Sequence, residues 1–317
     1  MDNLTHSLVG AVLGQMGLKK KTGLAMPALI LAANLPDIDA GCAIYGIESL
    51  SMRRGVTHGP IALILLPLIL WWLLIAFDRW QTRRGTRPET RLPIDKGWLL
   101  ALCIIGCLSH PALDWLNNYG VRLLEPFSHR WFYADTLFII DLWIWLALGV
   151  SVWLSLRRER QGTASWRRPA WTGFTVVCTY IFANGLITGA AERGAAASLL
   201  ASGHQAPLVV ASPPPLAFWT RDIFWRDGDR YGSGSFTPGV GGKLDISGQP
   251  TGMDDVRLET WVKGDPAARA FLFWARMPVA ESDSDAIILS DQRYMQPLAR
   301  DRFTIHVQAP DTASYPE

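Results

Sequence analysis

The chain has 317 residues, with 30 Lys and Arg against 28 Asp and Glu and a formal net charge of +2. This near-balance, without a dense basic tract, gives no indication of a nucleic-acid partner. All four cysteines precede residue 191, which excludes a disulfide framework in the remainder. The composition divides in two, because the first ~190 residues carry long apolar runs and most of the tryptophan, whereas the rest has an ordinary soluble composition.

Two short apolar segments open the chain, at residues 4–18 and 24–35, and both are rich in small residues. They fall below the ~20 apolar residues that cross a bilayer, so we expect a short helical hairpin packed against the other helices. Longer apolar segments follow at 60–77, 97–116, 137–155 and 171–190. The sequence therefore predicts about four membrane helices after the hairpin.

The basic residues predict how these helices are oriented. Arg and Lys are concentrated in the loops at 78–96 and 156–170, which the positive-inside rule places in the cytoplasm. Residues 117–136 and everything after about 191 then lie on the outer, periplasmic side. Arg53 and Arg54 are exceptions, since they fall on that outer side, and this makes them candidates for a specific role.

Beyond the last span, residues 192–204 form a connector and a proline-rich run follows it. Short runs typical of β-strands come next, separated by Gly, Pro and Asp: VRLETWV (256–262), RAFLFWARM (269–277), DAIILSD (285–291) and RFTIHVQ (302–308). We expect a mainly α-helical membrane domain at 1–191, a helical bundle with its N-terminal hairpin, and a small β-rich domain outside the membrane at 205–317.

Ionisable side chains are few in or beside the apolar segments, and such groups are costly enough in a membrane to be functional candidates. The predicted topology brings all of them to the outer leaflet, although random placement would scatter them between both sides. They are His6, Asp37, Asp39, His58, His110 and Asp114, with Asp135 and Asp141 at the start of the next span.

These residue types suit a divalent metal ion, because imidazole nitrogens and carboxylate oxygens are ligands of zinc, manganese and iron. His110 and Asp114 are four residues apart, so both lie on one face of a helix. Asp37 and Asp39 follow Pro36, which indicates a turn or a helix start from which both can face a common site. A metal held there favours hydrolysis, by activating water and polarising the scissile bond.

Each element also has a structural interpretation. His6 could be a surface residue, the aspartates of PDID could cap a helix, and His58 could end a loop. His110 and Asp114 could form no more than a mutual hydrogen bond. The convergence of all these residues on one leaflet is what favours the metal site.

Five motifs within residues 1–190 resemble the YdjM family of inner-membrane proteins: LTHSLVG, NLPDID, RRGVTHGP, SHPALDWLNNYG and RWFYADTLFIID. The resemblance implies a membrane-bound metal-dependent hydrolase. That family is distantly similar to the zinc-dependent phospholipase C and P1 nuclease group, which is all-helical and holds zinc with His and Asp. His110 and Asp114 match the H-x-x-x-D helix of that group, and by the same analogy Asp37 or Asp39 would be the bridging carboxylate.

The leading hypothesis is an integral inner-membrane hydrolase with one or two divalent ions at the outer leaflet, zinc in the first place and manganese or iron as alternatives. Arg54, beside His58, is expected to bind an anionic group such as a phosphate. The position of the site suggests a lipid or lipid-linked phosphoester as substrate. The expected metal ligands are His6, Asp37, Asp39, His58, His110 and Asp114, and the expected catalytic residues are Asp37, Asp39, His110 and Asp114.

Two hypotheses from other classes stay open. In a non-enzymatic membrane protein, the same residues would form a structural cluster or a pathway for protons or metal ions. A pathway needs polar residues at several depths, whereas the cytoplasmic half of each span is apolar. In a membrane scaffold, the outer domain would bind a partner and would retain the activity alone.

Overall fold

The computed structural model describes residues 1–283, 285–296 and 300–309, which form two compact units. Unit 1 comprises Met1–Asp39, Arg54–Thr188 and Ser212–Trp219. Unit 2 comprises Ala40–Arg53, Gly189–Ala211 and the described residues from Thr220 onward. Helices make up most of unit 1, and the strands lie mainly in unit 2.

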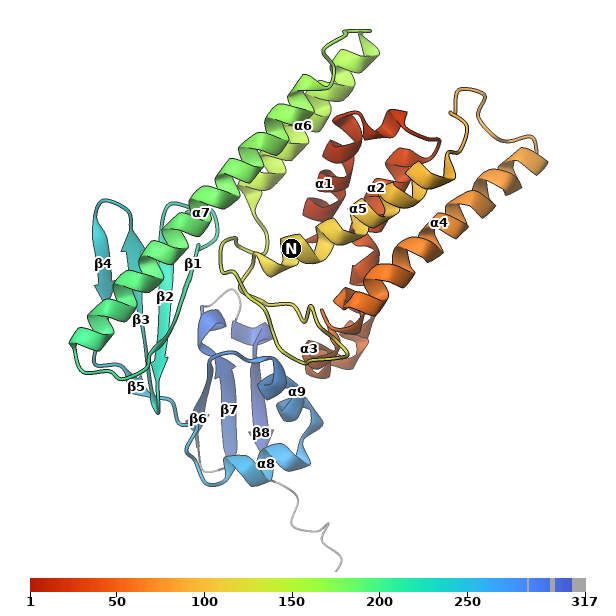
Figure 1. The fold of residues 1–317 in the computed structure, drawn as a ribbon. Helices are drawn as coiled ribbons and strands as arrows, with labels where there is room; N and C mark the ends of the chain where they lie inside the picture. The colour runs from red at the N-terminus through yellow and green to blue at the C-terminus, as the bar shows by residue number, and fades with distance from the viewer. Residues whose placement is uncertain (284, 297–299, 310–317) are drawn as a thin grey trace, which may run out of the picture. The chain divides into compact units, whose positions relative to one another are not determined.

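Unit 1 is a bundle of helices (Figure 1). The short helices η1 (Leu18–Lys20), η2 (Leu35–Glu48), α3 (Ser49–Met52) and η3 (Val56–His58) connect longer ones, although most of η2 and all of α3 belong to unit 2. The longer helices are α1 (Asn3–Gln15), α2 (Ala25–Asn34), α4 (Pro60–Arg83), α5 (Lys96–Trp115), α6 (Leu142–Arg160) and the first part of α7 (Arg168–Ala201).

Helices α1 and α5 approach α2 closely because each has a glycine where the backbones meet. A Cβ at Gly10 of α1 would lie 2.8 Å from the carbonyl oxygen of Leu29, and a Cβ at Gly106 of α5 would lie 2.8 Å from the same oxygen. Small residues at helix contacts permit this approach. The expected N-terminal hairpin is therefore part of a packed group of three helices, which fixes the end of α2 against the end of α5.

Four helical segments are long and apolar enough to cross a membrane: Ala25–Met52, Pro60–Arg83, Lys96–Trp115 and Arg168–Ala201, with mean hydropathies of 1.3, 2.6, 1.4 and 1.5. The last three confirm the spans predicted at 60–77, 97–116 and 171–190. The first differs from the prediction, because the segment expected to end at residue 35 continues through η2 and α3 to a length of 28 residues.

The segment predicted to span the membrane at 137–155 is not among these four. Helix α6 begins only at Leu142, where Asp141 accepts hydrogen bonds from the backbone N–H groups of Trp143 and Ile144. Its last turn carries Arg157, Arg158 and Arg160. The apolar part between these ends rises about 22 Å, which is less than the ~30 Å of a hydrocarbon core.

The basic loops of unit 1 meet at one end of the bundle. Lys19 forms an ion pair with Glu159 at the end of α6. The N–H of Asp95, which caps the start of α5, donates to Thr22 Oγ1 at 2.8 Å. His110 and Asp114 are near the other end of α5, about 20 Å or more from Asp95 along the helix axis. The polar residues predicted to converge are therefore remote from the basic loops.

Unit 2 contains two antiparallel sheets (Figure 1). The first has the order β1-β2-β3-β4, with β5 also paired to β3, and the second has the order β6-β7-β8. Their strands are β1 (Leu208–Ser212), β2 (Arg221–Asp227), β3 (Arg230–Thr237), β4 (Gly241–Leu244), β5 (Gln249–Pro250), β6 (Pro278–Ser282), β7 (Ala286–Asp291) and β8 (Thr304–Gln308).

Two of the four runs predicted as strands in this part are helices. DAIILSD and RFTIHVQ contain β7 and β8, as expected. VRLETWV instead overlaps α8 (Leu258–Gly264), and the first six residues of RAFLFWARM belong to α9 (Pro266–Trp274). The physical reason is the start of α9, where the Asp265 side chain accepts from the N–H groups of Ala267 and Ala268, and Pro266 occupies the first turn. Phe271 and Trp274 then point into the core of unit 2, at 0% exposure.

Candidate metal centre

The six residues predicted as metal ligands come together in unit 1, from α1, η2, η3 and α5. His6, His58, His110 and Asp114 are completely buried, and Asp37 and Asp39 are 7% and 8% exposed. The chain therefore places three imidazoles and three carboxylates in a region that water barely reaches. Groups of this kind are costly to bury without partners.

Four of the six form the centre of this cluster. Asp37, His58, His110 and Asp114 each offer one ligand atom, and these atoms all lie within 4.8 Å of one another. His110 Nε2 lies 3.6 Å from Asp37 Oδ1 and 3.5 Å from Asp114 Oδ2. His58 Nε2 lies 3.4 Å from the same Asp114 oxygen. Two ligand atoms bound tetrahedrally at ~2.1 Å from one zinc ion are about 3.4 Å apart, so these separations suit a shared ion.

The tautomer of His110 is fixed by the backbone of α2. Its Nδ1 lies 2.6 Å from the carbonyl oxygen of Ala33. A carbonyl can only accept, so Nδ1 carries the hydrogen and Nε2 of the neutral ring presents a lone pair to the two carboxylates. Metal-binding histidines commonly have this arrangement, with the second ring nitrogen held by a carbonyl or a carboxylate.

A short relay orients His58 in the same way. His58 Nδ1 lies 2.9 Å from Thr57 Oγ1, and that hydroxyl donates to Asp39 Oδ2 at 2.8 Å. Because the single hydroxyl hydrogen is used on Asp39, the threonine oxygen accepts from Nδ1–H, and His58 Nε2 presents its lone pair to Asp114. Burial, with repulsion from His110 and Arg54, lowers the pKa of His58 well below its ordinary value and keeps the imidazole neutral.

The converging atoms are not satisfied by hydrogen bonds. Among the residues that the structure describes, His58 Nε2, His110 Nε2 and Asp114 Oδ2 are buried and make none. Lone pairs of nitrogen and carboxylate oxygen that face one another repel unless a cation lies between them. The residues present therefore fit a divalent metal ion.

His6 lies beside this centre. Its ring stacks on that of His110, with centroids 3.7 Å apart, and its Nε2 lies 3.5 Å from Asp114 Oδ1. The amino nitrogen of Met1 also contacts Asp114 Oδ1. Asp114 therefore lies between two groups of ligands, with Oδ2 toward His58 and His110 and Oδ1 toward His6. The bridging role that the resemblance implies for Asp37 or Asp39 stays a prediction.

Arg54 is also part of this environment. The residue is 4% exposed, and its Nε lies 3.0 Å from Asp114 Oδ2, an ion pair without hydrogen-bond geometry. Nη1 donates to Asn117 Oδ1 at 3.0 Å, and the group lies over the ring of Tyr119. The backbone of Arg54 has a φ of +53°, a strained conformation for a residue with a side chain. Its N–H donates to Asp39 Oδ2, which holds that conformation.

Some polar residues outside the cluster have other roles. Asp141 caps α6 and accepts from Tyr180 at 2.8 Å. His129 is exposed and lies 2.9 Å from Glu125. Cys107 packs in the apolar core of α2, α4 and α5.

Three groups that support the cluster were not predicted from the sequence: Thr57, Asn117 and the Ala33 carbonyl. Their roles depend on contacts between segments that are distant in the chain.

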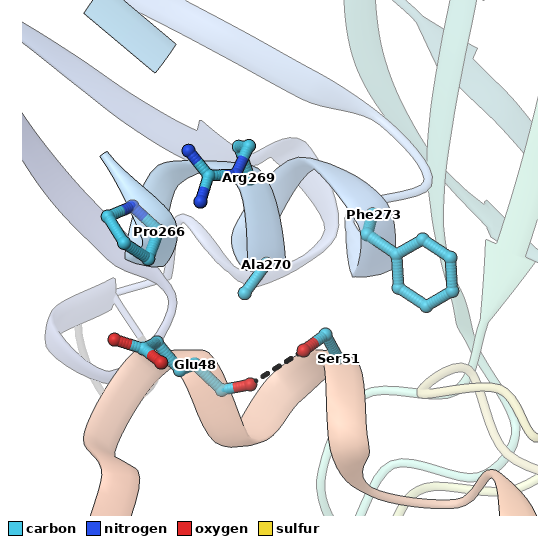
Figure 2. A pocket seen from close by; sticks show the side chains of 6 residues that line it. All are labelled: Glu48, Ser51, Pro266, Arg269, Ala270 and Phe273. Carbon is cyan, nitrogen blue, oxygen red and sulfur yellow. Dashed lines mark hydrogen bonds between the residues drawn. The ribbon is translucent and has the colours of Figure 1, made fainter. Parts of the chain in front are cut away.

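Unit 2 has a separate pocket of about 340 Å³ between α9 and the segment that contains α3 (Figure 2). Its polar lining includes the carboxylate of Glu48 and the guanidinium of Arg269, and Ser51 donates to the Glu48 carbonyl at 2.8 Å. None of the six residues predicted as metal ligands lines this pocket.

The fold and the site define an integral membrane protein with a buried His/Asp cluster that could hold a metal ion. Residues 1–191, more than half of the chain, match the family described as YdjM inner membrane protein, and the chain belongs to that family. It is therefore an inner-membrane protein. No curated protein and no solved structure matches the chain.

Proposed function

We propose that this protein is a metal-dependent hydrolase of the inner membrane, with Asp37, His58, His110 and Asp114 holding a divalent ion. The observation that carries the proposal is the convergence of their ligand atoms within 4.8 Å, with both histidines held in the tautomer that binds a metal. Zinc is the ion we propose first, since imidazole and carboxylate are among its usual ligands, and manganese and iron are alternatives.

The donor set supports hydrolysis better than a purely structural metal. Structural zinc sites commonly contain cysteine, whereas a mixture of histidine and carboxylate is common at hydrolytic sites. When bound, the ion would supply an activated water and polarise the scissile bond. Asp37 and Asp39 are the most exposed of the six residues, so we assign to them the contact with incoming water.

The remaining residues would fix the centre and receive the substrate. Asp39 and Thr57 orient His58, and the Ala33 carbonyl orients His110. Arg54 adds a permanent positive charge 3.0 Å from Asp114 Oδ2, and a guanidinium matches the geometry of a phosphate. We therefore propose that Arg54 binds an anionic group of the substrate.

The proposed substrate is a lipid or lipid-linked phosphoester at the outer leaflet. The basic loops lie at the end of unit 1 remote from the His/Asp cluster, and the positive-inside rule places such loops in the cytoplasm. The cluster would then face the periplasm. A substrate drawn from the surrounding lipid would reach such a site without crossing water.

One observation favours a second candidate, a non-enzymatic role for the same cluster. Four of its six residues have no exposed surface at all, and closed metal sites are typically structural. In that case the ion would join α1, η2, η3 and α5 without reacting. The first candidate function predicts turnover of a substrate, and the second predicts a bound metal without turnover.

A phosphoesterase assay separates them. Purified full-length protein in nanodiscs would be given phospholipids and lipid pyrophosphates, beside His110→Ala, Asp114→Asn and the control Cys107→Ala, a buried apolar position on the same face of α5. We expect wild type and the control to release phosphate from lipid pyrophosphates or a phosphate monoester from phospholipids, and we expect this release to fall at least 100-fold in both other variants and after chelation. Release that is insensitive to the chelator and to both variants would contradict the proposal. A bound metal without turnover on any of these substrates would favour the structural role.

A further inference from the structure

The segment that follows α5 forms a small hairpin in unit 1 with an apolar tip. Val121 and Phe132 pair as an antiparallel bridge, with N–H···O distances of 3.0 and 2.9 Å. Between them, Leu124 is 44% exposed and Phe127 is 75% exposed. Large apolar side chains at a loop tip are costly to leave in water, so this tip requires an explanation.

The hairpin is held firmly at its base. The N–H of Arg122 donates to the carbonyl of Arg54 at 2.9 Å. Within the turn, Glu125 is 6% exposed and pairs with Arg122 and with His129. The N–H of Phe127 donates to the Leu124 carbonyl at 2.8 Å, which closes the turn. The exposure of the tip is therefore a property of an ordered loop.

The hairpin also lies directly beside two membrane helices. Helix α5 ends at Trp115, six residues before Val121, and both α5 and α4 are candidate spans. A Cβ on Gly59, the residue that precedes α4, would lie 1.9 Å from the carbonyl oxygen of Glu125. The backbone at the tip is thus packed against the start of α4, where a bilayer surface continues from the span.

The charges of the hairpin fit a phospholipid surface. The carboxylate of Glu125 is buried against Arg122, so it is not presented outward. His129 and Arg130 are exposed at the same tip. An apolar tip bordered by basic side chains is the pattern that inserts into anionic lipid interfaces.

We infer that the 121–132 hairpin is a membrane-contacting element, with Leu124 and Phe127 among the lipid acyl chains and Arg130 at the level of the lipid phosphates. The partner is the phospholipid bilayer around α4 and α5. Because the same hairpin is hydrogen-bonded to the backbone of Arg54, it places lipid next to the residues around the His/Asp cluster. Lipid contact at this tip requires neither a bound metal nor hydrolysis.

Site-directed spin labelling of the full chain in nanodiscs of phosphatidylethanolamine and phosphatidylglycerol tests this directly. The background carries Cys42→Ala and Cys178→Ala, since Cys103 and Cys107 are buried. Nitroxide labels are placed on Leu124→Cys, Phe127→Cys and Arg130→Cys, and on Thr163→Cys as a control in the exposed turn between α6 and α7. Collision rates with oxygen, which partitions into lipid, are compared with those of a water-soluble nickel chelate.

We expect labels at positions 124 and 127 to collide more often with oxygen than with the nickel chelate, and the label at 163 to collide more often with the chelate. The ratio of the two collision rates at 130 should lie between these values. Nickel-dominated collisions at 124 and 127, equal to those at 163, would place the tip in water and overturn the inference. Low collision rates with both reagents at 124 and 127 would show that protein covers the tip, and this also overturns it. Metal content and activity do not enter the measurement, so its failure is distinct from a failure of the proposed function.

Discussion

Arg54 Nε lies 3.0 Å from Asp114 Oδ2, the carboxylate oxygen that also faces the Nε2 atoms of His58 and His110. A permanent cation therefore stands beside the converging ligand atoms. It reduces the repulsion among the buried carboxylates, and it leaves a positive charge next to any bound ion. The strained backbone of Arg54 shows that this position is maintained at a cost of about 1–3 kcal/mol.

Replacing this cation should separate metal binding from anion binding. In Arg54→Gln, the side chain keeps an N–H donor while the positive charge is lost. We expect metal affinity at least equal to wild type, because repulsion between Arg54 and the ion disappears. We expect inhibition by phosphate or vanadate to weaken by about tenfold or more, which corresponds to ~1.4 kcal/mol. Competition with a chromophoric chelator and inhibition titrations measure the two effects. Unchanged inhibition would refute the assignment of Arg54 as the anion-binding residue.

The hydroxyl of Thr57 should matter for metal affinity although it is not a ligand. Thr57→Val keeps the shape of the side chain but removes the link between His58 Nδ1 and Asp39 Oδ2. Loss of such a supporting group typically weakens metal binding 10- to 100-fold, and we expect that range here. Thr57→Ser retains the hydroxyl and should bind the metal like wild type. Equal affinities in the Val and Ser variants would show that the relay does not orient His58.

The close contact of α5 with α2 should be sensitive to a single methyl group. In Gly106→Ala, the new Cβ would lie 2.8 Å from the Leu29 carbonyl oxygen and 2.8 Å from the Ala32 Cβ, so the helices must separate. Overpacking of this kind costs about 1–3 kcal/mol. Gly97→Ala on the same helix is the control, since its Cβ would lie 3.5 Å from Asp95 Oδ1, an ordinary van der Waals contact. Thermal unfolding in detergent should show a lower midpoint for Gly106→Ala alone, and similar midpoints would contradict the contact.

Unit 2 should lose stability in acid through Asp291. This carboxylate is fully buried, and Arg293 Nε and Nη2 donate to its two oxygens at 2.8 Å. Burial by itself raises the pKa of Asp291, but the charge and hydrogen bonds of Arg293 outweigh this and lower the pKa below its ordinary value. Because the folded pKa is depressed, the stabilisation is present above about pH 4, the unfolded value, and is lost as the pH falls through the folded value.

Asp291→Asn should cause the same loss of stability in unit 2 at neutral pH. Removing one charge of a buried pair leaves the other without compensation, at a cost of about 3 kcal/mol or more. Limited proteolysis that reports cleavage within residues 220–296 measures the change. Asp254→Asn, at an exposed position, is the control and should stay within about 0.5 kcal/mol of wild type. If both variants resist the protease equally well, the Asp291–Arg293 pair contributes little to the stability of unit 2.

Much of the fold of the membrane part follows from local pattern and charge. Apolar length predicted three of the four candidate spans, and the asymmetry of the basic loops predicted that His6, His58 and His110 would come to one end of the bundle. The four-residue spacing of His110 and Asp114 placed both on one face of α5. These features depend on periodicity and on helix direction, which a single sequence contains.

The remaining features depend on tertiary contacts that have no local signature. Asp39 reaches His58 through Thr57, and the position of Asp114 at the centre of the cluster results from the packing of α1 and α5 around α2. Similarly, α9 was predicted as a strand because RAFLFWARM is rich in aromatic and apolar residues. The cap formed by Asp265 and Pro266 and the packing of Phe271 and Trp274 outweigh that preference.

The most direct test of the metal centre is elemental analysis of the purified full-length protein. Wild type, His110→Ala, Asp114→Ala and the control Cys107→Ala would be prepared in parallel, with helix content checked by circular dichroism. We expect one or two equivalents of a divalent metal, zinc in the first place, in wild type and in Cys107→Ala. We expect the metal to be lost in both other variants, with their helix content unchanged. A wild-type protein without stoichiometric metal, or retention of the metal in both His110→Ala and Asp114→Ala, would contradict the proposed metal centre.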